Sequence, residues 1–421
     1  MTIHSSDRQR ALSLVVEVRA GDQQPLEAVL TELGGNGSSC TSDQLRFTQI
    51  PTLHFARVVL VPESADGLLP AVLVLGAYYD GEEGAHLDCL VRECGSGLRS
   101  IFRHCPGFPA DASDAQLRAY MVAHLVTPPV FYTGARQRPL HLIQAEADLR
   151  TAIAGFLATR SWAGEPPAVV RTAIQAFVAG QPNLSWAIAP ELLGGVPEWL
   201  RRIGAMGLLL LRAIPLLLWV LPYIRFAEER EKTAPVRPTN PVSEGLLLAR
   251  EDYGMQNQLS HLSTVKAGLF RRVTLRLVLR AVEVLSNHIY IRGNLANIQT
   301  IHFARFLELN GGRRLLFFSD FDRSWDSYLS EFVDRAFRGL TGIWSNTEGF
   351  PPARWLIYDG ARDEQGFKQW TRQSQIITQV WYRAPLYEGL TIQNVLNNTR
   401  LRQGLTGEMD AASVTQWLRL L

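Results

Sequence analysis

A short motif that could carry chemistry occurs twice in this chain. Residues 54–57 and residues 302–305 both read His-Phe-Ala-Arg, 248 positions apart. Histidine can transfer protons or bind a metal near neutral pH, and arginine pairs with carboxylates and other anions. An aspartate follows each motif at the end of the next predicted strand. The candidate catalytic residues are therefore His54, Arg57, Asp80, His302, Arg305 and Asp322.

Strand geometry constrains how these residues could act together. On a strand, His54 and Arg57 point to opposite faces, so one surface does not receive both. A buried arginine needs an anionic partner, and we expect Arg57 to pair with Asp80 and Arg305 with Asp322. The alternative is a structural network that ties strand to turn in both copies, because a single catalytic site needs an asymmetry that a repeat does not itself provide.

The motif belongs to a longer internal duplication. Beyond it the match continues at a separation of 242, for example between Gly107-Phe108-Pro109 and Gly349-Phe350-Pro351. The six-residue change lies in a turn between two predicted strands, where length varies most easily. Hydrophobic periodicity predicts the order βαββαβ in each copy, which is the ferredoxin-like motif. The predicted strands are 12–19, 54–61, 71–79 and 129–133, then 260–266, 302–309, 315–321 and 379–383; the helices of the first copy are 25–33 and one starting near Leu87, and in the second copy 269–285 and one starting near Leu329.

This pattern resembles the dimeric α+β barrel superfamily over about residues 10–150 and 255–405. The resemblance implies α+β architecture, with two tandem ferredoxin-like units that form a pseudo-dimeric barrel. That superfamily includes the dye-decolourising haem peroxidases, whose G-x-x-D-G hallmark is broken here in Gly76-Ala77-Tyr78-Tyr79-Asp80-Gly81. The resemblance also implies haem as a cofactor to test, with His302 or His54 as the iron ligand and arginine and aspartate assisting peroxide cleavage.

The segment between the copies predicts membrane contact. Residues 203–224 are almost entirely apolar and carry one charge, Arg212. The length suits a span, but two units that share a barrel must lie on one side of a bilayer. We therefore expect a monotopic anchor lying in the membrane surface, with Trp219 in the interface and a bend at Pro215 and Pro222. A buried core helix is the alternative.

A second helix supports this interpretation. Arg272, Arg276 and Arg280 recur at four-residue spacing, and such a stripe suits anionic lipid headgroups. The same stripe could equally pair with acidic neighbours on a solvated face. The sequence thus divides into residues 1–155 as a first ferredoxin-like unit, 156–258 as a helical insertion with a Pro-rich linker, and 259–421 as a second unit.

Composition narrows the function classes. The 42 basic and 40 acidic residues leave a net charge of +2, which disfavours nucleic acid as a partner. Cys89, Cys94, Cys105 and two nearby histidines do not repeat in the second copy, so we predict buried free thiols rather than a metal site. The start of the chain has no secretory signal, and we expect the protein at the cytoplasmic face of a membrane.

These observations predict a membrane-associated α+β barrel protein that binds or oxidises a lipophilic small molecule, such as a lipid or a quinone. An apolar barrel cavity opening at the bilayer would admit such a ligand. Two alternatives stay open: a haem-dependent, peroxidase-like oxidoreductase, and a non-catalytic scaffold recruited to the membrane. If the protein is an enzyme, we expect an oxidoreductase of the peroxidase or monooxygenase kind. The oligomeric state is not indicated.

Overall fold

The computed structural model describes residues 8–35, 39–188, 198–230, 241–252, 254–286 and 298–421. It shows a mixed α/β protein with two four-stranded antiparallel sheets. The first sheet has the order β1-β3-β2-β10, and the second has the order β4-β6-β7-β5. The strands of the first half of the chain are β1 (Gln9–Glu17), β2 (Leu53–Val61), β3 (Val72–Asp80) and β4 (Val130–Thr133), and those of the second half are β5 (Gln256–Thr264), β6 (Ile301–Leu309), β7 (Arg314–Asp322) and β10 (Val380–Arg383).

The two halves of the chain exchange their last strands. β4 pairs with β6 of the other half, and β10 pairs with β2. The sequence predicted that each of these strands would close its own unit, and that expectation was wrong. β4 and β10 have four residues each and pair only with the sheet of the other half. The residues just before each strand form a bridge to the sheet of its own half.

Two seams therefore join the sheets, each made by one continuous stretch of chain. In the first seam (residues 124–133), Leu125 bridges to Leu14 of β1 before the chain becomes β4. In the second seam (residues 375–383), Gln375 bridges to His261 of β5 before the chain becomes β10. One edge strand of each sheet, β1 or β5, is thus hydrogen-bonded to the chain that continues into the other sheet, and the opposite edge strand, β10 or β4, is the end of such a connection.

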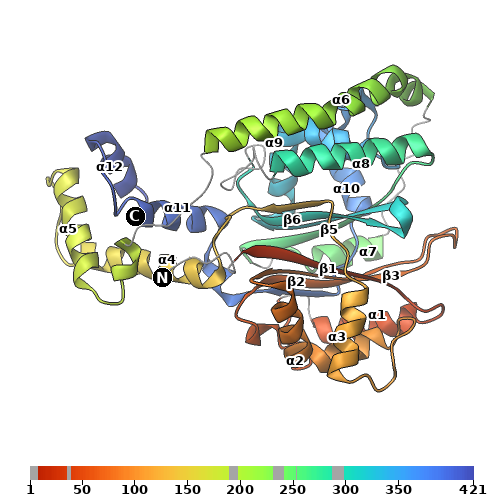
Figure 1. Ribbon diagram of the computed structural model, residues 1–421, viewed down its shortest axis with the longest axis horizontal. Coiled ribbons are helices and arrows are strands. Elements are labelled where there is room, and N and C mark those ends of the chain that lie inside the picture. The colour runs from red at the N-terminus through yellow and green to blue at the C-terminus, as the bar shows by residue number, and fades with distance from the viewer. Residues whose placement is uncertain (1–7, 36–38, 189–197, 231–240, 253, 287–297) are drawn as a thin grey trace.

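The sheets lie face to face between two helical layers (Figure 1). Helices α1 (Gln23–Gly34), α2 (Glu83–Phe102) and α3 (Asp114–Ala123) cover the first sheet, and α8 (Leu269–Val284), α9 (Trp325–Trp344) and α10 (Glu364–Ser374) cover the second. Between the sheets lies a third apolar cluster that includes Val59, Val74, Leu307 and Phe318. Because both of their faces are covered, β2 and β3 are buried along their whole length.

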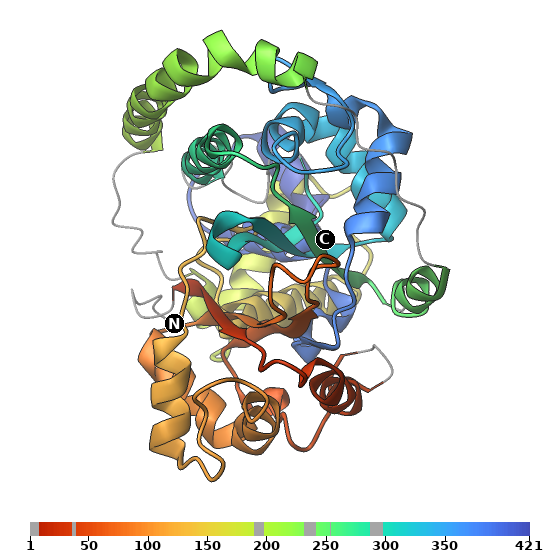
Figure 2. The same cartoon turned by 90° about the vertical axis from the view of Figure 1, so that its right-hand side faces the viewer.

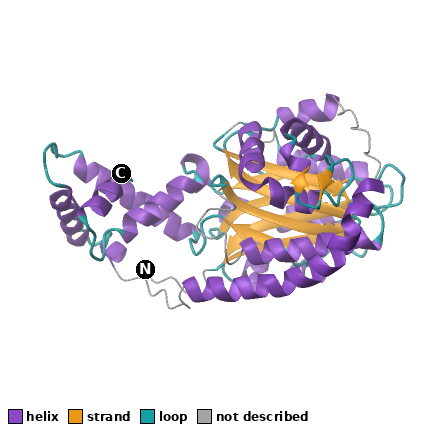
Figure 3. Ribbon diagram, turned by 90° about the horizontal axis from the view of Figure 1, so that it is seen from above, coloured by secondary structure: helices purple, strands orange, loops and turns teal. Residues whose placement is uncertain are grey.

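A helical arm extends from one end of the sheets (Figures 1 and 3). It contains α4 (Leu140–Leu157) and α5 (Pro167–Gly180), which pack against α11 (Ile392–Gln403) and α12 (Ala411–Leu418) around a separate core. Trp162 and Trp186, which the sequence left unplaced, pack on this core. Since α4 follows β4 and α11 follows β10, the arm extends the duplication beyond the strands.

The apolar central segment forms one long helix, α6 (Glu198–Arg230), which passes over α8. Figure 2 shows α6 as an arc, consistent with the prolines within it. A short helix, α7 (Pro241–Leu248), follows; residues 231–240 of the predicted linker lie outside the described residues. In the described part of the chain, no helix combines the length and apolar character needed to cross a membrane.

Candidate functional site

Each histidine of the repeated motif binds the aspartate of its own half. His54 Nε2 lies 2.8 Å from Asp80 Oδ1, and His302 Nε2 lies 2.8 Å from Asp322 Oδ1. All four side chains are buried. The duplicated residues therefore occupy corresponding positions on β2 and β6 and at the ends of β3 and β7.

The second carboxylate oxygen of each aspartate caps a helix of the arm. Asp80 Oδ2 accepts a hydrogen bond from the backbone N–H of Leu140, and Asp322 Oδ2 accepts one from Ile392, both at 2.8 Å. These are the first residues of α4 and α11, where backbone N–H groups lack helical partners and the helix dipole favours an anion. The His–Asp pairs thus anchor the helical arm to the sheets.

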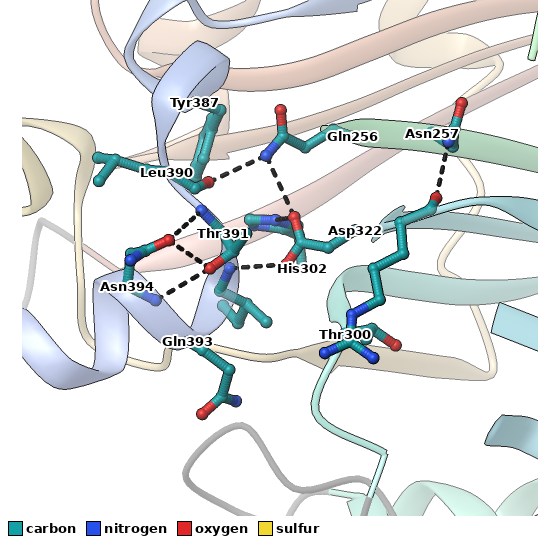
Figure 4. Close-up of polar contacts among 12 residues, drawn as sticks. Gln256, Asn257, Thr300, His302, Asp322, Tyr387, Leu390, Thr391, Gln393 and Asn394 are labelled. Carbon is teal, nitrogen blue, oxygen red and sulfur yellow. Dashed lines mark hydrogen bonds and ion pairs between the residues drawn. The ribbon is translucent and has the colours of Figure 1, made fainter. Parts of the chain in front are cut away.

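The surroundings of the two pairs differ. Gln256 donates to Asp322 Oδ1 at 3.1 Å, as Figure 4 shows, and Tyr387 donates to or accepts from His54 Nδ1 at 2.7 Å. Tyr387 also packs edge-on against the His302 ring, with 5.0 Å between centroids. Burial, together with the negative charges of both aspartates, raises the pKa of Tyr387 well above its usual range. Tyr387 therefore stays neutral and joins the two pairs.

The arginines do not pair as the sequence predicted. Arg57 and Arg305 each cross to the opposite sheet, so neither meets the aspartate of its own half. The expectation that Asp80 and Asp322 would be their partners was wrong because the histidines and helix ends already occupy those carboxylates. The strand register shifts at His54 on β2 and at His302 on β6, so the regular alternation of faces that the sequence predicted is interrupted at both histidines.

Arg57 finds a carboxylate in the second sheet. Its Nη2 lies 2.6 Å from Asp320 Oδ1, and Nη1 donates to the Leu259 carbonyl oxygen at 2.9 Å. Trp381 of β10 donates its indole N–H to the same Asp320 oxygen at 2.9 Å. The guanidinium also lies over the Phe318 ring, 4.7 Å from its centroid. The Arg57 guanidinium therefore has several acceptors, whereas Asp320 Oδ2 has no hydrogen-bond partner among the described residues.

Arg305 occupies the equivalent position, but it has no carboxylate within ion-pair distance in the described part of the chain. Its Nη1 donates to the Leu12 carbonyl oxygen and, at 3.0 Å, to Ser13 Oγ. Where Arg57 meets Asp320, Arg305 meets Tyr78, whose ring centroid is 4.5 Å away. Within the described residues, Arg305 Nε and Nη2 have no hydrogen-bond partner. Burial lowers the pKa of this guanidinium and raises the pKa of Tyr78 to about 12.

Gly76 makes room for this arginine. A Cβ at Gly76 would overlap Arg305 Nη2, whereas the corresponding residue of the second half is Phe318. Arg57 and Arg305 both lie against the Phe318 ring, but among the described residues only Arg57 forms an ion pair with the buried Asp320. The repeat consequently places an excess of positive charge between the sheets.

A cleft opens at the first seam, next to Arg305. Its volume is about 1130 Å³, and its lining includes Ser13 and Phe131. Ser13 binds Arg305, and Phe131 stacks on Tyr78 with 5.8 Å between ring centroids. Five arginines also line the cleft, and none of them was predicted from the sequence to be a site residue. They come from three separate parts of the chain, and the local signals were two Arg-Gln-Arg triplets, at residues 8–10 and 136–138.

The histidines do not fit as haem ligands. Both ring nitrogens of His54 are hydrogen-bonded, and its ring packs against Phe303 with 5.2 Å between centroids. His302 Nδ1 has no partner in the described residues, but its ring packs against Phe55 and Tyr387, which leaves no face for a macrocycle. Among the described residues that line the cleft there is no histidine or cysteine to bind iron.

Metal-binding side chains elsewhere are dispersed. In the part of the chain that the structure describes, no three or more His, Cys, Asp or Glu side chains are grouped to hold an ion. Cys94 and Cys105 are buried free thiols, and burial raises the pKa of each to about 12. His86 is buried with neither ring nitrogen hydrogen-bonded in the described residues, and burial lowers its pKa to about 3.

The predicted membrane residues fall into two groups. The side chains of Arg212 and Trp219 lie outside the described residues. Arg276 of α8 pairs with Glu308 at 2.9 Å, which is the acidic pairing considered as the alternative for this stripe. Arg280 is exposed and Arg272 is half-buried.

Comparisons with known proteins add no assignment. No protein-family model, curated protein or solved structure matches this chain.

Proposed function

We propose that this protein is a membrane-surface binding protein built on two tandem ferredoxin-like units that form a pseudo-dimeric α+β barrel. The barrel is supported by the identical strand order of the two sheets, the exchange of β4 and β10, and the two seams that connect the sheet edges. The His–Asp pairs serve this framework, since one carboxylate oxygen of each aspartate binds a strand histidine and the other caps an arm helix.

The observation that carries the membrane proposal is an apolar stripe on α6. Its members are exposed large hydrophobic residues, with Leu211 and Leu218 exposed by 67% and 74%. The stripe consists of Ile203, Leu211, Ile214 and Leu218. Successive separations of eight, three and four residues place these side chains on one helix face. Val220 and Ile224 point the other way and are buried, so the stripe faces outward. A contiguous exposed apolar surface marks an interaction site.

A bilayer surface is the occupant we favour. A long helix with an outward apolar face and neighbouring cations suits insertion in the headgroup region rather than a crossing. The C-terminal part of α6 contacts α8 through Tyr223 and Phe270, so the exposed Arg280 belongs to the adjoining helix. Anionic headgroups would attract such a cation.

Vesicle co-sedimentation tests this proposal with a closely matched control. Leu218 and Leu68 are 74% and 72% exposed, but only Leu218 lies on the stripe. We expect Leu218→Gln to weaken binding to phosphatidylglycerol-containing vesicles about tenfold, because burying one leucine stabilises by roughly 1.5–3 kcal/mol. Leu68→Gln should bind like the wild type.

Either of two results would overturn membrane attachment. The first is wild-type protein that stays in the supernatant with vesicles at low salt. The second is a stripe that mediates self-association instead, seen as a dimer in size-exclusion chromatography that Leu218→Gln dissociates while vesicle binding is absent.

A further inference from the structure

The cleft at the first seam is strongly basic although the whole chain is nearly neutral. Its charged lining consists of five arginines and one glutamate, whereas the complete sequence has 42 basic and 40 acidic residues. The charged residues are Arg8, Arg10, Arg136, Arg138, Arg400 and Glu83. A concave surface lined by one sign of charge concentrates ligands of the opposite sign. The cleft therefore favours an anion.

Acidic neighbours neutralise only part of this charge. Arg10 pairs with Glu82 at 2.8 Å, and Arg138 lies 3.6 Å from Glu146. In the described part of the chain, Arg8 and Arg400 have no carboxylate within ion-pair distance, and Arg400 donates only to Asn397 Oδ1 at 3.3 Å. These two side chains come from opposite ends of the chain, one before β1 and one on α11. Both side chains line the cleft, so both can contact a ligand bound there.

The inner wall of the cleft adds to the positive potential. Ser13 in this wall accepts a hydrogen bond from Arg305, which is fully buried and has no carboxylate partner in the described residues. Phe131, also in the wall, stacks on Tyr78, whose hydroxyl has no described partner. A buried cation is costly without a nearby anion. A ligand anion in the cleft would offset part of that cost.

We propose that this cleft binds a small molecule that carries phosphate groups. Arginine matches phosphate with paired hydrogen bonds, and a phosphate carries more charge than a single carboxylate. The phosphate could belong to a soluble molecule or to a lipid headgroup, because both present the same chemistry to the arginines. This inference does not depend on membrane attachment through α6.

Titration calorimetry with inorganic tripolyphosphate tests the proposal. We expect the wild type to bind, with affinity that falls as salt is added, and Arg8→Gln/Arg400→Gln to bind at least tenfold more weakly. Arg272→Gln/Arg280→Gln removes the same charge from α8, outside the cleft, and should change affinity less than twofold. Arg400→Gln alone should give an intermediate loss, which keeps the test valid if the double variant misfolds.

Competition identifies the source of the phosphate. If phosphatidylglycerol vesicles displace tripolyphosphate from the wild type, a lipid headgroup enters the cleft; if they do not, the ligand is soluble. Both results support phosphate binding. No binding at low salt, or an equal loss in the two double variants, would overturn the proposal, because binding would then be absent or would follow net charge alone.

Discussion

The two seams occupy equivalent places in the duplication, yet one is filled and the other is open. In the second seam, Asp320 holds both Arg57 and Trp381, and Thr378 lies 2.7 Å from Ser260 Oγ. In the first seam, the residues aligned with Asp320, Trp381 and Thr378 are Tyr78, Phe131 and Pro128. These replacements remove the carboxylate, the indole donor and the hydroxyl.

This difference distinguishes the residues that hold the fold together from those that form the proposed binding site. The His–Asp pairs and their helix caps are the same in both halves, as expected of parts that hold the fold together. The seams differ, and the cleft lies at the first seam, next to Arg305, which has no carboxylate partner among the described residues. A duplicated chain can form a single binding site once one copy loses the groups that fill it.

Arg57→Met should destabilise the protein most. It leaves Asp320 buried with only the Trp381 indole as a charge-stabilising donor, and breaking a buried pair from one side costs about 3–5 kcal/mol. The free energy of unfolding from urea denaturation measures this loss. A change below about 1 kcal/mol would mean that the Arg57–Asp320 ion pair does not stabilise the second seam appreciably.

The sequence indicated the repeat and the importance of its polar residues, but not the connections between the halves. Histidine, arginine and aspartate were recognisable because the same types recur at matching positions. The partner of Arg57 was not, because Asp320 lies in the opposite half and its repeat counterpart is a tyrosine. Strand exchange was equally hidden, since a four-residue strand such as β4 has the same hydrophobic pattern whichever sheet it joins.

His261→Leu should make the protein less sensitive to acid. His261 lies in the second seam where the first has Leu14, and burial lowers its pKa to about 3. In the unfolded chain His261 takes up a proton near pH 6.5, whereas in the folded chain it stays neutral until about pH 3. The free energy of unfolding is therefore unaffected by this group above pH 6.5 and decreases as the pH falls from 6.5 toward 3. The slope is up to about 1.4 kcal/mol per pH unit.

Urea titrations at pH 7 and pH 5 measure this effect. The wild type should lose about 2 kcal/mol more than His261→Leu between these two values. His86→Phe serves as a control outside the seams, because burial lowers the pKa of His86 by the same mechanism and its removal should reduce the slope similarly. An unchanged slope in both variants would show that other groups govern acid stability.

Trp381→Phe should have a smaller effect, because it converts one seam residue to its counterpart. The variant loses the indole hydrogen bond to Asp320, while Arg57 still neutralises the carboxylate. Hydrogen bonds to charged groups contribute about 1.5–3 kcal/mol, so we expect a loss near the lower value. The reverse change, Phe131→Trp, places an indole in the open seam and serves as the matched variant. Equal losses in the two would argue against a specific bond to Asp320.

Arg305→Met should change stability least, although Arg305 is as deeply buried as Arg57. The substitution removes hydrogen bonds to Leu12 and Ser13, but it also removes a buried charge that has no carboxylate partner in the described residues. Replacing an uncompensated buried ion by an apolar side chain of similar length avoids its desolvation cost. The two effects oppose each other, so we expect a change of at most about 1 kcal/mol. The same urea measurement that detects the large loss in Arg57→Met would reveal this difference between the seams. A loss of about 3 kcal/mol in Arg305→Met would show that the first seam contains a strong partner for the arginine and that its buried charge is already compensated without a ligand.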